Sequence, residues 1–276
     1  MALSSEGLAA ELDALASEKR ITLAVAATFT DGTPIVSLRA DEPYYPASTI
    51  KVPIMAEVFH QALRGRFSLS DPIPLTPEDQ VTGSGVLQHL SSGISLPIRD
   101  LITLMIIVSD NTATNMLIDL VGTEAVTEFM RSLGLEHTVL LNKLQVVPTE
   151  RKGANMTSAG DLTHLLVQIA QSRVVSYDAC RRMVDILLRQ TATNGIAGEL
   201  PTESPDPTLG ALPPVKVASK SGMIQGMNHD IGLVLRAQHS YAVSILLRDV
   251  PNPSVGVPTI ARISRRIYDH VVELEG

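Results

Sequence analysis

The clearest chemistry in this sequence lies in Ser48 and Lys51, which form its one Ser-x-x-Lys spacing. An apolar run follows, which predicts that a helix begins here. Residues three positions apart lie on one face of a helix, so both side chains should share a face near the positive end of the helix dipole. A serine becomes a strong nucleophile when a base takes its proton, and lysine is such a base once burial or a second cation lowers its pKa. Taken alone, the pair also fits a serine N-cap with a solvated lysine. Pro53 predicts an irregular or kinked first turn.

Two further clusters place polar side chains between structural elements. Ser109, Asp110 and Asn111 form a short connection between two apolar helical segments, and a buried connection must satisfy its polar groups. The same three residues would also serve as an ordinary helix cap. Lys220-Ser221-Gly222 should close a strand, where the glycine lets a ligand approach the backbone, although a strand ending in a plain turn fits equally.

The elements that must position these residues follow from periodicity and turn residues. The strongest hairpin signal joins strands 20–30 and 33–39 through Asp31-Gly32, because that dipeptide supplies the positive φ values of a tight turn. Further strands are predicted at 215–220, 230–237 and 241–249. Helical spacing is found at 52–63, 98–108, 112–121, 124–133, 158–171 and 177–188, and near both termini, within residues 1–20 and at 259–275.

This order predicts an α+β fold with a discontinuous lobe. Residues 1–41 and 211–276 should form an α/β lobe in which the terminal helices flank a sheet, and residues 42–210 an all-helical lobe. The sheet should be antiparallel, because the links between its strands are too short for crossover helices.

Bulk composition excludes several classes of function. The chain has 276 residues, of which 45% are hydrophobic and 18% charged, and a net charge of −7. Such a chain buries a substantial core, and its acidity argues against a nucleic-acid surface. No apolar run approaches the length of a membrane span, so we expect no membrane-spanning segment. The first twenty residues lack the apolar core of a signal peptide, which leaves either an intracellular chain or one whose leader has been removed.

In this order, Ser-x-x-Lys, Ser-Asp-Asn and Lys-Ser-Gly are the signature of the penicillin-recognising active-site serine enzymes. The chain resembles that family, and class A β-lactamases in particular, over essentially its whole length. Residues 81–87 (VTGSGVL) also resemble the Gly-Ser-Gly segment that often precedes the second motif. The resemblance implies a β-lactamase/transpeptidase-like fold, a small-molecule β-lactam or a D-Ala-D-Ala-type peptide as substrate, no cofactor or metal, and a monomer. Family members are usually exported, but the sequence leaves the compartment of this chain open.

The resemblance also assigns roles to residues. Ser48 would be the acylated nucleophile, Lys51 would help to deprotonate it, and Ser109 would relay a proton to the leaving nitrogen. Substrate binding falls to the following residues: Asn111 for a side-chain amide, Lys220 and Ser221 for the carboxylate, Gly222 for close approach, and the backbone N–H of Met223, with that of Ser48, for the oxyanion.

Two positions depart from the family pattern. Alignment of residues 136–144 puts Gln145 where class A enzymes carry the glutamate that activates the deacylating water. A glutamine amide cannot accept that proton, so we expect acylation to survive and turnover to slow. Glu150 is the nearest carboxylate, although a solvated surface residue is the better interpretation. His229 falls where the family usually has an arginine that helps to bind the carboxylate; a histidine that merely begins a strand is the alternative.

Three functions therefore remain open. The first is a β-lactamase-like hydrolase that clears its acyl-enzyme slowly. The second is a D-alanyl-D-alanine peptidase or small-ester hydrolase that uses the same serine. The third is a non-catalytic binder of β-lactams or cell-wall peptides, which the complete set of nucleophile, relay and anchor residues argues against.

Overall fold

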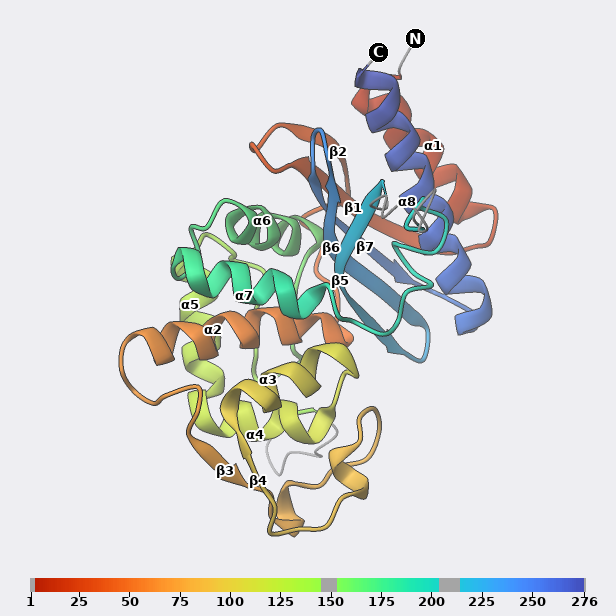
Figure 1. Ribbon diagram of the computed structural model, residues 1–276. Coiled ribbons are helices and arrows are strands. Elements are labelled where there is room, and N and C mark those ends of the chain that lie inside the picture. Colours follow the sequence, from red (N-terminus) through yellow and green to blue (C-terminus); the bar gives the residue numbers. More distant parts are fainter. Residues whose placement is uncertain (1–2, 145–152, 204–213, 276) are drawn as a thin grey trace.

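A five-stranded antiparallel sheet is the centre of the fold in the computed structural model, which describes residues 3–144, 153–203 and 214–275 (Figure 1). The strand order is β2-β1-β7-β6-β5. The strands are β1 (Thr22–Phe29), β2 (Pro34–Leu38), β5 (Val215–Ile224), β6 (Met227–Arg236) and β7 (Tyr241–Arg248). Because β5 is an edge strand, one side of its backbone has no partner strand in this sheet.

The first hairpin forms where the sequence predicts it. Gly32 has a φ of 102°, and the carboxylate of Asp31 accepts a hydrogen bond from the backbone N–H of Thr33 at 2.8 Å. β1 pairs with β2 on one side and with β7 on the other, all antiparallel. The predicted antiparallel sheet is therefore confirmed.

Helices cover both faces of this sheet (Figure 1). The terminal helices α1 (Ser5–Ser17) and α8 (Pro253–Glu275) pack together on one face, over a core that includes Leu8, Leu12 and Ile263. On the other face, α6 (Ala159–Ala170) lies against β1 and β7 and joins the sheet to the helical half. α8 begins six residues before its predicted start and includes Pro258.

The middle of the chain supplies the other helices. They are α2 (Lys51–Leu63), α3 (Ile98–Ile107), α4 (Asn111–Val121), α5 (Thr123–Ser132) and α7 (Tyr177–Leu187). A small antiparallel ribbon, β3 (Pro72–Pro74) with β4 (Ser95–Pro97), also lies in this part of the chain, so it is not all-helical as predicted. The division into two lobes remains a proposal.

β5 and β6 form a longer hairpin than the sequence predicts. The sequence predicts a strand at 215–220 that is closed by Lys220-Ser221-Gly222. Instead β5 continues to Ile224, with Gly222 paired to His229 and Ile224 to Met227. The polar triplet therefore lies within the edge strand, because pairing with β6 extends a strand that local residue preferences would end.

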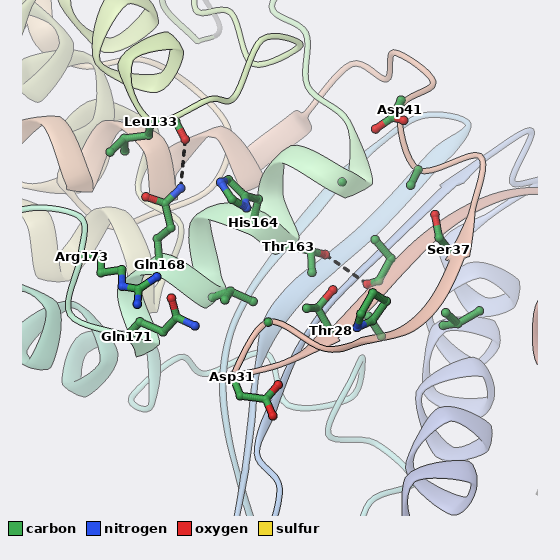
Figure 2. A pocket seen from close by; sticks show the side chains of 18 of the residues that line it. Thr28, Asp31, Ser37, Asp41, Leu133, Thr163, His164, Gln168, Gln171 and Arg173 are labelled. Carbon is green, nitrogen blue, oxygen red and sulfur yellow. Dashed lines mark hydrogen bonds between the residues drawn. The ribbon is translucent and has the colours of Figure 1, made fainter. Parts of the chain in front are cut away.

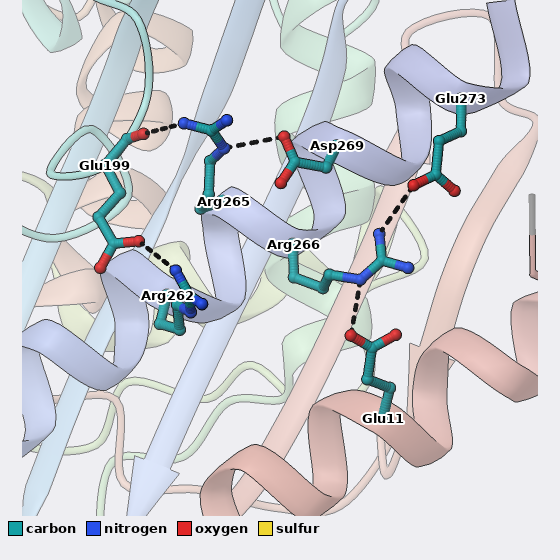
Figure 3. A network of polar contacts seen from close by, with 7 residues as sticks. All are labelled: Glu11, Glu199, Arg262, Arg265, Arg266, Asp269 and Glu273. Atoms are coloured by element: carbon teal, nitrogen blue, oxygen red, sulfur yellow. Dashed lines mark hydrogen bonds and ion pairs between the residues drawn. The ribbon is translucent and has the colours of Figure 1, made fainter.

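A stretch of chain between α7 and β5, here called the connecting segment (residues 191–200), joins the helical half to the sheet. At its start, the N–H and the hydroxyl of Thr191 both donate to the carbonyl of Ile107 at the end of α3, at 3.2 and 2.8 Å. At its end, Glu199 is held by two arginines of α8: its carboxylate pairs with Arg262 at 3.4 Å, and its carbonyl accepts from Arg265 at 3.2 Å (Figure 3). The segment is thus fixed on both sides.

Candidate active site

Ser48 lies in a single turn of 3-10 helix, Ala47–Ile50, that leads directly into α2. This 3-10 turn is the irregular beginning of the helix that Pro53 predicts. Ala47 has a φ of 46°, a left-handed conformation that costs free energy for a residue with a side chain. The hydroxyl of Thr49 donates to the carbonyl of Pro46 at 2.6 Å and closes this turn. Ser48 itself remains partly exposed.

Lys51 is fully buried at the start of α2. Its Nζ lies within hydrogen-bond distance of three oxygens: the carbonyl of Ser109 at 2.7 Å, the hydroxyl of Ser109 at 3.0 Å, and Oδ1 of Asn111 at 2.9 Å. These contacts connect the first and second sequence motifs. They exclude the solvated lysine that the pair alone also allowed.

The surroundings of Lys51 favour its neutral form. Burial is the largest cause and holds its pKa well below the ordinary value, the positive charge of Lys220 lowers it further, and the carboxylate of Asp110 opposes both. A lysine in such a site can accept a proton from a neighbouring hydroxyl. This is the electrostatic condition that a base beside Ser48 must meet.

Ser109 joins the two cations. It lies between the end of α3 and the start of α4 with a φ of 55°, in the left-handed region. Its hydroxyl is 3.0 Å from the ammonium of Lys51 and 3.2 Å from that of Lys220. A hydroxyl between two amines has a donor on either side, which is the arrangement that a proton relay needs.

Lys220 reaches Ser109 from β5. It is 1% exposed, and its ammonium also donates to the carbonyl of Ser221 at 2.6 Å. Burial lowers the pKa of Lys220 to about 8, against the opposing effect of Asp230. Below that pH the lysine is charged, so it places a cation next to the partly exposed Ser221 on the edge strand of the sheet.

Gly222 brings β5 against the turn that holds Ser48. A Cβ atom at this position would lie 2.9 Å from the backbone nitrogen of Ser48 and 3.1 Å from that of Thr49. The strand can therefore approach this closely only with glycine. Met223 follows with its side chain 52% exposed, on the same strand as the close approach.

Asp110 is the N-cap of α4, the capping role that the sequence offered as an alternative, and it also holds the preceding segment. Its side chain caps α4 through Ala113 N at 2.9 Å, and its other oxygen accepts from the N–H groups of Val86 and Leu87 at 2.7 and 2.9 Å. Gly85, with a φ of 108°, lies so close that a Cβ there would come within 2.3 Å of Asp110. The segment 81–87 is thereby held beside Asn111.

A family model matches nearly the whole chain. The model of the "Beta-lactamase enzyme family" matches residues 7–271. The chain belongs to this family. A β-lactamase from Rhodobacter capsulatus is 39% identical to it over 99 residues, which are 36% of this chain and 33% of the relative. The match therefore spans only about a third of that relative.

Solved structures of similar proteins cover nearly all of the chain. A β-lactamase from Sphaerobacter thermophilus has a TM-score of 0.88 with 28% identity, over 98% of this chain and 99% of that one. PBP-A has a TM-score of 0.84 with 27% identity, over 96% of each chain. A leucine-to-glutamate mutant of PBP-A, solved as an acyl-enzyme with penicillin G, has a TM-score of 0.85 with 26% identity, over 97% of each chain. The β-lactamase/transpeptidase-like fold is thus confirmed.

The predicted deacylating residue Gln145, and Glu150 as its possible substitute, lie outside the described residues, so their assignment stays a prediction. The chain is fixed immediately before it. Leu144 and Asn115 exchange two hydrogen bonds, from Leu144 N to Asn115 Oδ1 at 2.9 Å and from Asn115 Nδ2 to Leu144 O at 2.8 Å. Residue 144 is therefore held on α4, about one helical turn beyond Asn111.

His229 does not fit the expected role of a carboxylate ligand. It is 1% exposed, its Nδ1 accepts from the N–H of Leu247 at 3.2 Å, and its Nε2 contacts the carbonyl of Tyr45 at 2.9 Å. Burial lowers its pKa to about 4, so it is neutral at physiological pH. Both nitrogens are used within the protein, and His229 is a structural residue that ties β6 to the chain before Ser48.

The described residues contain no group of three or more metal-ligating side chains and no helix that could span a membrane. A cavity of about 740 Å³ lies away from the motifs, between the β1–β2 hairpin and α6 (Figure 2). Its labelled polar side chains include Asp31, Asp41 and His164. No residue of the three sequence motifs lines it.

Proposed function

We propose that the protein is a serine acyl-enzyme hydrolase of the class A β-lactamase type that opens β-lactam rings through Ser48. The observation that carries the proposal is the position of the Ser109 hydroxyl between the side-chain nitrogens of Lys51 and Lys220, at 3.0 and 3.2 Å. This arrangement links all three motifs in one site. A solvated lysine and a plain strand end would have no reason to meet there, and the helix cap that Asp110 provides does not account for the contacts of Ser109.

The acylation step follows from these contacts. Ser48 Oγ attacks the lactam carbonyl carbon while its proton passes to the neutral amine of Lys51, whose pKa is lowered by burial and by Lys220. The backbone N–H groups of Ser48 and Met223 stabilise the negative charge that develops on the carbonyl oxygen. The carbon–nitrogen bond then breaks, and the leaving nitrogen takes the proton of the Ser109 hydroxyl. Ser109 recovers a proton from the lysines that donate to it.

Substrate binding uses the remaining polar groups. Lys220 and Ser221 bind the carboxylate that β-lactams and D-Ala-D-Ala-type peptides share, with Lys220 charged below its pKa of about 8. Asn111 has given its oxygen to Lys51, while its amide nitrogen, 3.3 Å from the carbonyl of Thr82, retains a second N–H for the substrate's side-chain amide. No cofactor enters these steps.

Deacylation is the slow step in this proposal. With Gln145 in place of the family's glutamate, no carboxylate at that position accepts a proton from the attacking water. A positioned general base is worth roughly 10²–10⁴-fold in rate. The acyl-enzyme should therefore persist for much longer than it does in an efficient β-lactamase.

A D-alanyl-D-alanine peptidase or small-ester hydrolase is the second candidate. Two observations favour it: the similarity to PBP-A over 96% of both chains, and the glutamine at position 145. Such an enzyme needs no lactam-clearing glutamate. It would use Ser48, Lys51 and Ser109 in the same way but release its acyl group from a peptide or an ester.

One pair of assays separates the candidates. A chromogenic cephalosporin and a D-Ala-D-Ala peptide are given to the protein, and each product is measured alongside the intact mass of the protein. Cephalosporin turnover with a covalent intermediate supports the β-lactamase. Peptide cleavage with a stable penicillin adduct supports the peptidase. Reaction with neither substrate and no adduct would contradict both.

A further inference from the structure

Gln190 is a buried amide near the site for which the steps above have no use. It is 8% exposed and lies shortly after the end of α7 at Leu187. Its Nε2 donates a hydrogen bond to Oγ of Ser219 on β5 at 2.8 Å, and its Oε1 accepts one from the backbone N–H of Ala192. Because Ser219 is only 5% exposed as well, water cannot readily replace this contact, and a buried polar group that loses its partner is costly.

This hydrogen bond ties the edge strand of the sheet to the helical half. α7 packs against both α3 and β5, and the chain leaves α7 beside β5 (Figure 1). Among the residues that the structure describes, side chains of β5 form hydrogen bonds with the middle of the chain at two positions only, Lys220 with Ser109 and Ser219 with Gln190. The strand ladder holds β5 through β6 alone. The placement of Lys220 relative to the helical half therefore depends on its neighbour Ser219, in addition to the packing of Gly222.

The residue after Gln190 anchors the other side of the same contact. Thr191 donates from its N–H and its hydroxyl to the carbonyl of Ile107, at 3.2 and 2.8 Å, and Ile107 lies shortly before Ser109. The two residues thus hold one segment close to Ser109 and another close to Lys220. With the 3.2 Å contact between Ser109 and Lys220, these bonds close a ring. Thr191 is exposed, so water can replace its hydroxyl, whereas the buried bond of Gln190 is the link that a substitution can open.

We infer that Gln190 is a positioning residue for Lys220. By fixing the preceding residue of β5, it keeps the lysine within hydrogen-bond distance of Ser109. If this bond is lost, the edge strand should move away from the loop between α3 and α4, and Lys220 should withdraw from both Ser109 and Lys51. The effect of Gln190 on acylation rests on the proposed function, whereas its effect on the position of Lys220 does not.

The titration of Lys51 reports on that withdrawal. Burial is the largest cause of its lowered pKa, the charge of Lys220 lowers it further, and the carboxylate of Asp110 opposes both. If Lys220 moves away, one of the two lowering causes weakens, so the pKa of Lys51 should rise. A residue that served stability alone would lower the free energy of unfolding without changing this titration in the folded protein.

The test compares Gln190→Met, Ser219→Ala and the double variant. Each should lower the rate of acylation by a chromogenic cephalosporin roughly 10- to 100-fold, the cost of a misplacement of about 1 Å, and should raise the pKa of Lys51. That pKa is followed by NMR of lysine labelled at ¹³Cε, with Lys51→Arg to assign the signal. Both substitutions remove the same bond, so the double variant should lose no more than either single variant. Gln168→Met loses a hydrogen bond of 3.0 Å to the carbonyl of Leu133, away from the motifs, and as the matched control should leave both measurements unchanged.

The two measurements separate the possible results. An unchanged pKa of Lys51 in both single variants, or losses that add in the double variant, would overturn the inference. If Gln190→Met does not fold, Ser219→Ala still decides, because it removes a single oxygen atom from the strand. If the unmodified protein forms no acyl-enzyme, the proposed function fails, and the titration of Lys51 alone decides the inference.

Discussion

The ammonium of Lys220 lies 3.2 Å from the hydroxyl of Ser109, although 111 positions separate the two residues in the chain. The contact joins the edge strand of the sheet to the loop between α3 and α4. It brings a second cation close to Lys51, and two like charges in a buried site lower each other's proton affinity. The central claim of the mechanism is that Lys51 is neutral enough to act as a base; burial is the largest cause of its lowered pKa, and the nearby charge of Lys220 adds to it.

Substitution of Lys220 should therefore change the titration of Lys51. In Lys220→Met the pKa of Lys51 should rise, so the acid limb of the acylation rate should move to higher pH. Binding of a carboxylate-bearing substrate should weaken as well, by about 1.5–3 kcal/mol, the contribution of a charged hydrogen bond, or roughly 10- to 150-fold. Stopped-flow acylation by a chromogenic cephalosporin across pH measures both effects. Lys216→Met, an exposed change on the same strand, is the matched control; if the two variants behave alike, Lys220 has no such role.

Gly85 should be intolerant of any side chain. Gly85→Ala would introduce a Cβ within 2.3 Å of Asp110 at a φ of 108°. An alanine with positive φ costs roughly 1–2 kcal/mol, and overpacking against Asp110 should add about 1–3 kcal/mol. The free energy of unfolding should therefore fall by the sum of the two. Gly93→Ala separates the two contributions, since Gly93 has a φ of 92° and a Cβ added there would meet no atom within 4 Å. Denaturant unfolding gives the difference. Equal losses in the two variants would mean that Asp110 is not held against Gly85.

The pH dependence of stability should reveal the buried acid Asp230. Burial raises the pKa of Asp230 from 3.8 to about 7, so between these values the folded protein keeps a proton that the unfolded chain releases. The stabilisation from this proton is complete below about pH 4 and is lost as pH rises to about 7. Relative to Asp230→Asn, the unmodified protein should therefore lose stability over this range, with a slope of at most about 1.4 kcal/mol per pH unit. Urea unfolding at pH 4, 5.5 and 7 would refute this if the difference between the two proteins stayed constant.

Gln145 gives a prediction about the second chemical step. Gln145→Glu should speed deacylation more than acylation, up to the roughly 10²–10⁴-fold of a general base, less whatever a misplacement of about 1 Å removes. Burst kinetics separate the two steps, and Gln145→Met controls for the loss of the amide alone. Rapid penicillin turnover by the unmodified protein without a detectable acyl-enzyme would show that another residue is the base, and Glu150→Gln would then be the variant to examine.

The sequence predicts most of the fold because its signals are local. Asp31-Gly32 specifies a hairpin within a few residues, and the apolar spacing of the helices from α2 to α7 needs no partner to be recognised. The three motifs could be found for the same reason, since each lies in three or four consecutive positions. That the three motifs form one site, however, follows from the family resemblance and not from the residues themselves.

What could not be predicted depends on distant partners. The extension of β5 to Ile224 requires β6 beside it, and the short β3–β4 ribbon is held by pairing rather than by residue preference. His229 has the same sequence appearance whether it faces a ligand or lies buried between Tyr45 and Leu247. Asp230 has no motif at all. Its burial is seen only in the structure, where Gly195 and Ile196 of the connecting segment lie against its carboxyl group.

The most direct test of the account is the mass of the protein after brief exposure to penicillin G. Opening the ring by Ser48 adds the whole antibiotic and releases nothing, so intact mass spectrometry should show one added penicillin per chain, decaying slowly. Ser48→Ala should show no adduct, while Ser91→Ala, an exposed serine, should be labelled like the unmodified protein. An adduct that persists in Ser48→Ala, or unmodified protein that neither gains mass nor consumes penicillin, would contradict the claim that Ser48 is the nucleophile of a β-lactam-opening enzyme.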